Sequence, residues 1–220
     1  MLFESPYDER IPRSASTGRP SLPVPGTLGP PHCHRPRRCR EDAAIRHYPG
    51  HLSIRMEPEP RRLLIFDLDE TLVHASEFSL AHPCDFEVGT YLVYQRPFAR
   101  ELIEFAAARF DLAVWSSSSA AYVAAVVERL FAGVPLRFAW SVERCVQRVD
   151  ARSNSYVYIK DLRKAQKFGY TLERMTIIDD SPEKIARQPR CHLSVTPFTG
   201  ARDDVALPAL LQPLNALRLV

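Results

Sequence analysis

Two aspartates and a threonine directly follow a strongly apolar run in the segment FDLDETLVH. Leu63–Phe66 is apolar at every position, which predicts a buried strand, and Asp67, Asp69 and Thr71 come next. A D-x-D-x-T pattern arises by chance in only a few per cent of such chains if each residue type makes up roughly one residue in twenty. Carboxylates at a strand end can act as nucleophiles, transfer protons or hold a hard cation. The pattern therefore indicates a reactive site.

Two other predicted strands also turn polar where they end. Leu112–Trp115 runs into four serines that begin with Ser116. The apolar residues 175–178 run into Asp179 and Asp180. In open α/β sheets, the carboxyl ends of the strands form the edge at which ligands bind. We therefore expect these hydroxyls and carboxylates to gather beside the first pair of aspartates.

The chain from Arg61 onward predicts the elements that would hold these residues. Short apolar runs alternate with helical periodicity, which is typical of βα units around a largely parallel sheet. Two β-like insertions, residues 85–95 and 136–159, interrupt the pattern and are too short for a folded lid. We expect an α/β, Rossmann-like fold: a parallel sheet flanked by helices, a small β-hairpin flap, a small β insertion and no large cap domain.

Two helices are predicted between the strands, and a third after the last acidic pair. The first has Pro97 in its first turn and a four-residue face toward the sheet. That face is Phe98, Leu102, Phe105 and Arg109. The second covers roughly residues 120–131 and stops before Gly133. Ser181 and Pro182 are typical of an N-cap and first helical turn.

The segment FDLDETLVH resembles motif one of the haloacid dehalogenase superfamily of phosphohydrolases. It is most similar to the branch of the small phosphatases of the RNA polymerase C-terminal domain, also called NLI-interacting-factor-like phosphatases. The likeness continues in order through QRPFARELIEF, WSSSS, YIKDL and IIDDSPEK, and covers about residues 61–215. It implies a haloacid-dehalogenase-type fold and a magnesium-dependent phosphomonoester hydrolase with an aspartyl-phosphate intermediate, most often a protein serine/threonine phosphatase.

The resemblance also implies roles for the acidic residues and the threonine. Asp67 matches the nucleophile, and Asp69 matches the general acid and base, whose backbone carbonyl would also ligate the metal. Asp67, Asp179 and Asp180 would supply carboxylate oxygens to Mg²⁺. Asp180 departs from branch members that have Asn at this position. Thr71 would orient the loop by hydrogen bonding and assist phosphate binding.

Further positions match the phosphate-binding residues of the branch. Ser116 matches its phosphate-binding hydroxyl, and Ser117 would contribute a backbone amide. Lys160 matches the lysine that neutralises the nucleophile and the phosphate together. Only four of the 29 basic residues are lysines, which makes this one conspicuous. Arg96 aligns with a basic position of the branch, where contact with substrate and pairing with a structural acid are equally open.

The short insertions favour a phosphate displayed on a macromolecule, because a small metabolite would have to be enclosed. A protein carrying phosphoserine or phosphothreonine is therefore the expected partner. One alternative is a catalytically weak module that binds phosphopeptides or another partner. Another is a phosphatase of nucleic-acid ends. A cysteine-dependent phosphatase is excluded, because no cysteine is followed by arginine six residues later.

The first 56 of the 220 residues differ in composition from the rest. They hold nine of the 19 prolines, and nine arginines against five acids, without apolar periodicity. We interpret residues 1–56 as a disordered Pro/Arg-rich extension and residues 57–220 as the phosphatase domain. A sharper hypothesis is that Met56 is the natural start. The segment HCHRPRRC could hold zinc, but a disordered basic stretch is the favoured interpretation.

Charge, cysteine content and hydropathy limit the partners and the cellular compartment that we expect for the protein. The net charge is +3, and the basic excess belongs to residues 1–56, so nucleic acid is a disfavoured partner of the domain. The five cysteines are an odd number without a CxxC pair, which favours a reducing compartment. No run of about eighteen apolar residues could span a bilayer. We expect a cytoplasmic protein without a membrane partner, or a nuclear one in a eukaryote.

Overall fold

The computed structural model describes residues 61–150 and 155–217. The interpretation of residues 1–56 as a disordered extension, the Met56 start and the zinc hypothesis for HCHRPRRC lie outside the described residues. The elements below therefore all belong to the segment for which a phosphatase domain is expected.

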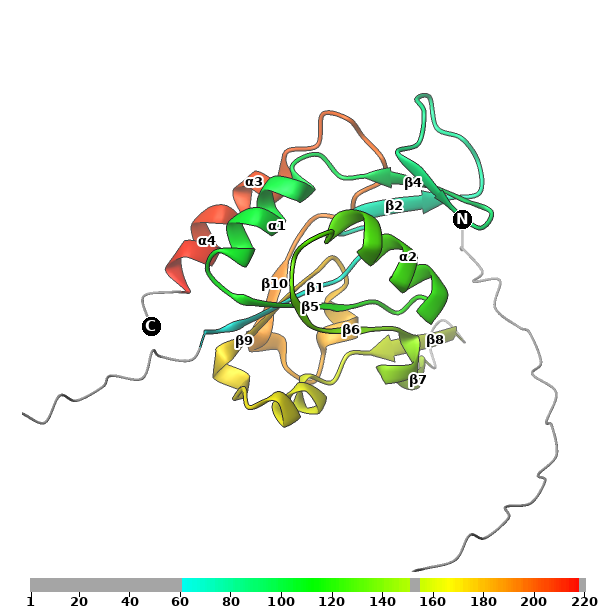
Figure 1. The fold of residues 1–220 in the computed structure, drawn as a ribbon. Helices are drawn as coiled ribbons and strands as arrows, with labels where there is room; N and C mark the ends of the chain where they lie inside the picture. Colours follow the sequence, from blue (N-terminus) through cyan, green and yellow to red (C-terminus); the bar gives the residue numbers. More distant parts are fainter. Residues whose placement is uncertain (1–60, 151–154, 218–220) are drawn as a thin grey trace, which may run out of the picture. The chain divides into compact units, whose positions relative to one another are not determined.

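A five-stranded parallel sheet forms the centre of this domain, in the order β10–β9–β1–β5–β6 (Figure 1). Its strands are β1 (Leu63–Phe66), β5 (Asp111–Trp115), β6 (Leu136–Trp140), β9 (Met175–Asp179) and β10 (His192–Ser194). The three strands expected from the sequence are β1, β5 and β9, and each lies within one residue of its expected bounds. Because β1 is the middle strand, the residue that follows it emerges at the centre of the sheet edge.

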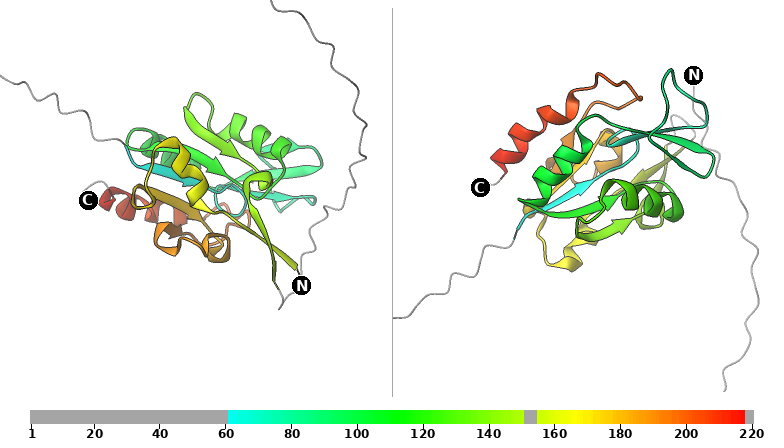
Figure 2. Two further views of the ribbon diagram at one scale, coloured as in Figure 1. Left: turned by 90° about the horizontal axis from the view of Figure 1, so that it is seen from below. Right: turned by 45° about the horizontal axis from the view of Figure 1, so that its top comes forward.

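Both faces of the sheet are covered, because every residue of β1 is fully buried. Leu64 and Phe66 point to one face, where they join the core that includes four α-helices. These helices are α1 (Ala99–Ala107), α2 (Ala120–Leu130), α3 (Ala206–Ala209) and α4 (Leu211–Ala216). Figure 2 shows α1 beside α3 and α4 on the same side of the sheet. Leu63 and Ile65 point to the opposite face. The α/β fold with a parallel sheet flanked by helices is thus confirmed.

Short 3-10 helices, together with Trp115 and Trp140, cover that opposite face. They are η2 (Leu162–Phe168), η3 (Leu172–Arg174), η4 (Pro182–Ile185) and η5 (Pro189–Cys191), and η1 (Val142–Arg144) follows β6. The helical turn expected at Ser181 and Pro182 is present, because Ser181 takes the N-cap position of η4 and Pro182 begins it. The turn is a short 3-10 helix, and Ser181 makes no side-chain capping bond.

The position of α1 also differs from the expectation. Phe98 precedes the helix with a left-handed φ of 65° and is 45% exposed, so the helix begins at Ala99. Its buried face consists of Ala99, Leu102, Ile103 and Ala106. Only Leu102 belongs to both the expected and the observed face. The second helix is confirmed: α2 ends at Leu130, just before Gly133, whose φ is 76°.

Two small antiparallel sheets accompany the central one. The first contains β2 (Val73–Ser76), β3 (Phe86–Val88) and β4 (Tyr91–Gln95) in the order β2–β4–β3. Figure 1 shows β2 and β4 beyond the carboxyl end of β1, where the expected flap belongs. The second is the hairpin of β7 (Val146–Asp150) and β8 (Ser155–Ile159), the small β insertion. The first part of that expected insertion, residues 136–140, is instead β6, an edge strand that buries Phe138 and Trp140 on one face. Within the described residues, no helix is long and apolar enough to cross a bilayer.

Candidate active site

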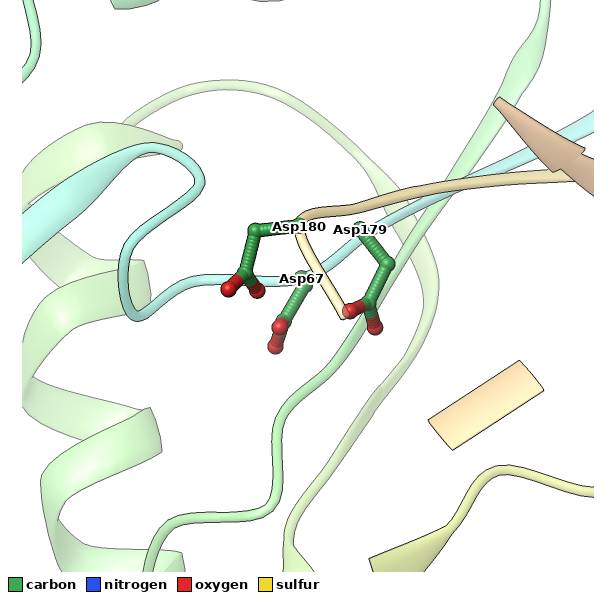
Figure 3. A group of neighbouring side chains, drawn as sticks. All are labelled: Asp67, Asp179 and Asp180. Carbon is green, nitrogen blue, oxygen red and sulfur yellow. The ribbon is translucent and has the colours of Figure 1, made fainter. Parts of the chain in front are cut away.

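Three aspartates meet at the carboxyl edge of the central sheet. Asp67 follows β1, Asp179 is the last residue of the neighbouring β9, and Asp180 comes next. One carboxylate oxygen from each lies within 4.8 Å of those of the others. Figure 3 shows all three side chains extending to the same side of the strand ends. Parallel pairing of β1 and β9 therefore brings together acids that are more than a hundred residues apart.

Lys160 bridges two of these carboxylates. It follows β8, is fully buried, and places its Nζ 2.7 Å from Oδ1 of Asp67 and 2.6 Å from Oδ2 of Asp179. A second lysine lies on the other side of the nucleophile candidate, with Nζ of Lys184 3.5 Å from Oδ2 of Asp67. Each oxygen of Asp67 thus faces one ammonium group.

Burial and neighbouring charges distribute the protons among these groups. Burial by itself raises the pKa of Asp67, but Lys160 and Lys184 outweigh it and hold this pKa below its usual value. Burial and the charge of Asp67 raise the pKa of Asp179 to about 7, although Lys160 opposes the shift. Asp67 is therefore ionised at neutral pH, whereas Asp179 is the carboxylate that titrates there.

Hydroxyl groups hold the side chain of Asp69. Tyr122 of α2 donates to Oδ1 at 2.6 Å, while Ser118 and Ser116 donate to Oδ2 at 2.6 and 3.1 Å. Burial and the Asp69 charge raise the pKa of Tyr122 above its usual range, so this hydroxyl remains a donor. Ser117 lies half-buried within the same turn. The expected serine cluster therefore positions an acid, through residues that follow β5.

The side-chain hydrogen bond expected of Thr71 is absent from the described part of the chain. Thr71 is fully buried, and its Oγ1 has no hydrogen-bond partner there. The backbone orients the loop instead, because the amides of Thr71, Leu72 and Val73 all donate to the carbonyl of Leu68 at 2.8–3.2 Å. The loop is therefore held by its backbone and not by the Thr71 side chain.

Arg96 lies outside the carboxylate cluster and is fully buried. Its Nε and Nη2 donate to both carboxylate oxygens of Asp204 at 2.8 and 2.9 Å. Nη2 also donates to the carbonyl of Thr196, and Nη1 to that of Thr71 at 3.1 Å. A substrate contact by Arg96 conflicts with this geometry, because its donors are already engaged and no part of it reaches solvent. The structure favours the second interpretation, an arginine paired with an acid. Through its bond to the Thr71 carbonyl, Arg96 also anchors the loop between Asp69 and β2, the motif loop.

Sequence reasoning missed Lys184, Ser118 and Tyr122. Burial lowers the pKa of Lys184, but Asp67, Asp179 and Asp180 outweigh it and raise that pKa above the usual value. The scarcity of lysine, which made Lys160 conspicuous, applies equally to Lys184 and could have identified it. No such signal distinguishes Ser118 from the serines beside it, or Tyr122 from a core residue of an amphipathic helix.

The acidic cluster fits a magnesium ion. All three side chains offer oxygen, the donor that Mg²⁺ prefers. Oδ1 of Asp180 is buried and accepts no hydrogen bond from the described residues. A buried carboxylate oxygen without a donor is costly unless a cation satisfies it. The side chain of Asp69 is engaged elsewhere, so only its backbone carbonyl remains for the metal role expected of it.

Comparison with known proteins gives a consistent family match. A family model described as NLI interacting factor-like phosphatase matches residues 62–220. A probable C-terminal domain small phosphatase of Dictyostelium discoideum is 29% identical over 164 residues, covering 71% of this chain and 50% of the relative. A CTD nuclear envelope phosphatase 1 homolog of Drosophila melanogaster is 28% identical over 173 residues, covering 72% of this chain and 68% of the relative.

An uncharacterized protein of Schizosaccharomyces pombe is 30% identical over 175 residues, covering 76% of this chain and 51% of the relative. The chain therefore spans about half the length of the Dictyostelium and Schizosaccharomyces proteins. A solved structure of Fcp1, an essential RNA polymerase II CTD phosphatase, matches with a TM-score of 0.49 and 16% identity, over 72% of this chain and 48% of that one.

Proposed function

Because the chain belongs to the NLI interacting factor-like phosphatase family, we propose that it hydrolyses phosphoserine or phosphothreonine esters of a protein through an aspartyl phosphate on Asp67. One observation carries this proposal. Asp67 is an ionised carboxylate at the centre of the sheet edge, with Lys160 at 2.7 Å and two further aspartates beside it. This arrangement supports Asp67 as the nucleophile and Lys160 as the cation for the phosphoryl oxygens.

In the first step, a carboxylate oxygen of Asp67 attacks phosphorus. The bond between phosphorus and the substrate oxygen breaks. Asp69, which takes up a proton before this step, gives that proton to the leaving oxygen. The ammonium of Lys160 stabilises negative charge on the nucleophile and on the phosphoryl group together. The products of this step are the free hydroxyl side chain and the aspartyl phosphate.

In the second step, Asp69 accepts a proton from water while the water oxygen attacks phosphorus. The bond between phosphorus and Asp67 breaks, which returns both carboxylates to their starting states and releases inorganic phosphate. The hydroxyls of Ser116, Ser118 and Tyr122 hold Asp69 in one orientation. The unpartnered hydroxyl of Thr71 and the amide of Ser117 are proposed contacts for phosphoryl oxygens. The hydroxyl of Ser116 is a third, which would turn to the phosphoryl group while Ser118 and Tyr122 continue to hold Asp69.

Asp67, Asp179 and Asp180, with the Asp69 carbonyl, are the proposed magnesium ligands. A bound Mg²⁺ would offset the negative charge of the transferring phosphoryl group. The support is the close set of carboxylate oxygens and the unpartnered Oδ1 of Asp180.

Mg²⁺ affinity is expected to rise with pH through 7. A protonated Asp179, whose pKa is raised to about 7, must lose its proton before it can ligate the metal. Below that pKa, each unit of pH should weaken binding by up to about tenfold, and above it the affinity should level off. Calorimetric titration of the full chain from about pH 5.5 to about pH 8.5 measures this. An affinity that is constant over this range, while the Asp179→Asn variant binds equally well, would contradict it.

Removing the hydroxyl of Tyr122 is expected to lower kcat about tenfold with little change in KM, because Asp69 loses a donor that fixes its orientation. Tyr170→Phe is a matched control. Tyr170 is equally buried and its hydroxyl donates to Asp111 at 2.5 Å, at the opposite end of the sheet. Both variants should lose about 1 kcal/mol of stability. Equal kcat values for Tyr122→Phe and Tyr170→Phe would refute the positioning role.

The proposed substrate class rests on the open surroundings of the site. The described residues include a three-stranded flap and a hairpin, but no folded lid that would enclose a small metabolite. The relatives named as C-terminal domain phosphatases give the class a precedent.

The experiment that tests the proposal measures phosphate release by the full chain from an aryl phosphate, with Mg²⁺ and with a chelator. Phosphopeptides and a 5′-phosphorylated oligonucleotide are then compared as substrates. Release that requires Mg²⁺ and is faster with phosphopeptides supports the proposal. Preference for the oligonucleotide with steep loss of rate in salt would favour a phosphatase of nucleic-acid ends. No release by folded protein with bound Mg²⁺ would favour a phosphopeptide-binding module.

We further propose that the protein works in a reducing compartment, the cytoplasm or the nucleus. The three cysteines among the described residues, Cys84, Cys145 and Cys191, are all free. Several relatives are named as nuclear envelope phosphatases, and this location belongs to those proteins.

A further inference from the structure

Lys184 places a second ammonium group inside the carboxylate cluster. Its Nζ lies 3.5 Å from Oδ2 of Asp67 and 3.9 Å from Oδ1 of Asp180, and its side chain is 20% exposed. The mechanism above uses Lys160 and leaves Lys184 without a role. A half-buried cation this close to the proposed nucleophile is not an incidental surface charge.

The backbone couples the two lysines. The amide of Lys160 donates to the carbonyl of Lys184 at 2.8 Å, and the amide of Lys184 donates to the carbonyl of Ser181 at 3.1 Å. These bonds tie the backbone positions of the two lysines to each other. Lys160 pairs with Oδ1 of Asp67 and with Asp179. Lys184 pairs with Oδ2 of Asp67 and with Asp180.

The two lysines differ in how firmly they are held. Lys160 donates a charge-assisted hydrogen bond of 2.6 Å to Asp179 and forms an ion pair of 2.7 Å with Asp67. The contacts of Lys184, at 3.5 and 3.9 Å, are longer than a good hydrogen bond. Its attachment is therefore mainly electrostatic, and its long, partly exposed side chain can move away without the loss of a specific bond.

Lys184 lies beside two of the proposed metal ligands, Asp67 and Asp180. Oδ1 of Asp180 has no hydrogen-bond donor among the described residues, and Lys184 is the cation beside it. A divalent ion that binds Asp67 and Asp180 would lie within a few ångströms of this ammonium group, and like charges at that distance repel strongly in a buried site. Ion and ammonium therefore compete for one edge of the cluster.

We propose that Lys184 is a displaceable counter-cation of the active site: it neutralises the Asp67–Asp180 edge in the metal-free protein and gives way when Mg²⁺ binds there. The inference rests on the proposed function, because it assigns Mg²⁺ to these aspartates. It also accounts for the extra negative charge of Asp180, which Lys184, four residues later, offsets. The built-in cation lowers metal affinity, and once displaced it remains close enough to contact an incoming phosphoryl group.

The test measures Mg²⁺ binding by calorimetry in the full chain, without substrate. Lys184→Gln is expected to bind Mg²⁺ at least about tenfold more tightly than the wild type, because the competing charge is gone. Lys167→Gln is the matched control. Lys167 is an exposed lysine that packs on Trp140, and its substitution removes the same charge at a place away from the aspartates. It should change the affinity less than about twofold. Unchanged or weaker binding by folded Lys184→Gln would overturn the proposal.

A double-mutant cycle tests the pairing with Asp180. Asp180→Asn alone should weaken Mg²⁺ binding, and Lys184→Gln should then tighten binding less than it does with Asp at this position, because the Asp180–Lys184 pair is already gone. If Lys184→Gln shifts affinity equally with Asp or Asn at this position, the competition does not involve Asp180, and this part of the proposal fails.

The response of the wild-type protein to Mg²⁺ provides a second measurement. The chain has only four lysines, so lysine labelled with ¹³C and ¹⁵N gives four side-chain signals, and Lys184→Arg identifies the relevant one. Addition of Mg²⁺ should move the Lys184 signal toward that of a solvated lysine, while the signals of Lys164 and Lys167 stay in place. A Lys184 signal unaffected by saturating Mg²⁺ would overturn displacement.

These outcomes separate the inference from the proposed function. If wild type binds Mg²⁺ and releases phosphate but neither the affinity of Lys184→Gln nor the lysine signal responds, only the role of Lys184 is wrong. If neither wild type nor Lys184→Gln binds Mg²⁺, the metal assignment fails, and the counter-cation role falls with it.

Discussion

Replacing Asp67 by Asn is expected to slow Mg²⁺-dependent phosphate release from an aryl phosphate at least about a thousandfold. The amide cannot form the acyl phosphate that divides hydrolysis into two steps. The change is nearly isosteric, so the β1 strand end and its backbone bond from Asp67 to the Ile178 carbonyl at 2.9 Å should remain. Initial rates at saturating substrate, with thermal unfolding as the check of fold, provide the measurement.

Asp111→Asn is a suitable control for this experiment. Asp111 begins β5, the strand next to β1, but at the opposite edge of the sheet, where it accepts bonds from Tyr170 and Arg137. Its replacement should affect stability without a comparable loss of kcat. A residual rate in Asp67→Asn above about a tenth of the wild-type rate would rule out Asp67 as the nucleophile.

The pKa of Asp67 adds a pH dependence to this expectation. Lys160 and Lys184 hold it below the usual value against the effect of burial, so the carboxylate stays ionised as the pH falls to the acidic range. A group with a lowered pKa in the folded protein stabilises the fold above its unfolded value and loses that contribution as the pH falls. Loss of the nucleophile by protonation therefore belongs to acidic conditions. A decline in activity between about pH 7 and pH 6 would reflect Asp179 instead.

The central strands and the acidic cluster could be predicted from the sequence because their signals are local. The apolar run of β1 and the polar residues that follow it are contiguous in the chain. Parallel pairing then places the ends of β1, β5 and β9 along one edge, whatever the connecting loops do. The meeting of Asp67 with Asp179 follows from topology alone.

Features that depend on tertiary contacts could not be predicted in this way. The sequence pattern predicts the wrong face for α1, because one residue, Phe98, adopts a left-handed φ and delays the helix start. The same kind of pattern places β6 in an insertion, because an edge strand with one buried face alternates like a flap strand. Asp204, the partner of Arg96, lies 108 residues away, and nothing in the local sequence points to it.

The role of Lys184 was missed for a different reason. A family motif draws attention to the positions that a family shares, and Lys184 lies at the end of IIDDSPEK beyond the acidic pair. Only its distance to Asp67, combined with the rarity of lysine in this chain, marks it as part of the site.

The motif loop depends on Arg96 as much as on its own sequence. Glu70 has a left-handed φ of 56°, which is unfavourable for a residue with a side chain. Its carbonyl accepts from the amide of Phe198 at 2.7 Å, and the neighbouring Thr71 carbonyl accepts from Arg96. Arg96 thus ties the loop between Asp69 and β2 to Asp204 and Thr196, near the end of the chain.

Arg96→Met is accordingly expected to destabilise the protein by about 3–5 kcal/mol, because it leaves a carboxylate and buried carbonyl groups without their donor. The midpoint temperature of thermal unfolding should fall by about 10 °C. Arg100→Met is the matched control: Arg100 also pairs with an acid, Glu104, at 3.1 Å, but both side chains are more than 60% exposed. An exposed pair of this kind contributes only about 0.3–0.5 kcal/mol.

Kinetics separate loop anchoring from substrate contact. At a temperature where Arg96→Met is fully folded, a displaced motif loop should lower kcat, because Asp69 is no longer held in register with Asp67. A contact with substrate would instead raise KM and leave stability close to that of Arg100→Met. The second pattern would restore Arg96 as a substrate-binding residue, whereas the first assigns it to the scaffold that shapes the nucleophile loop.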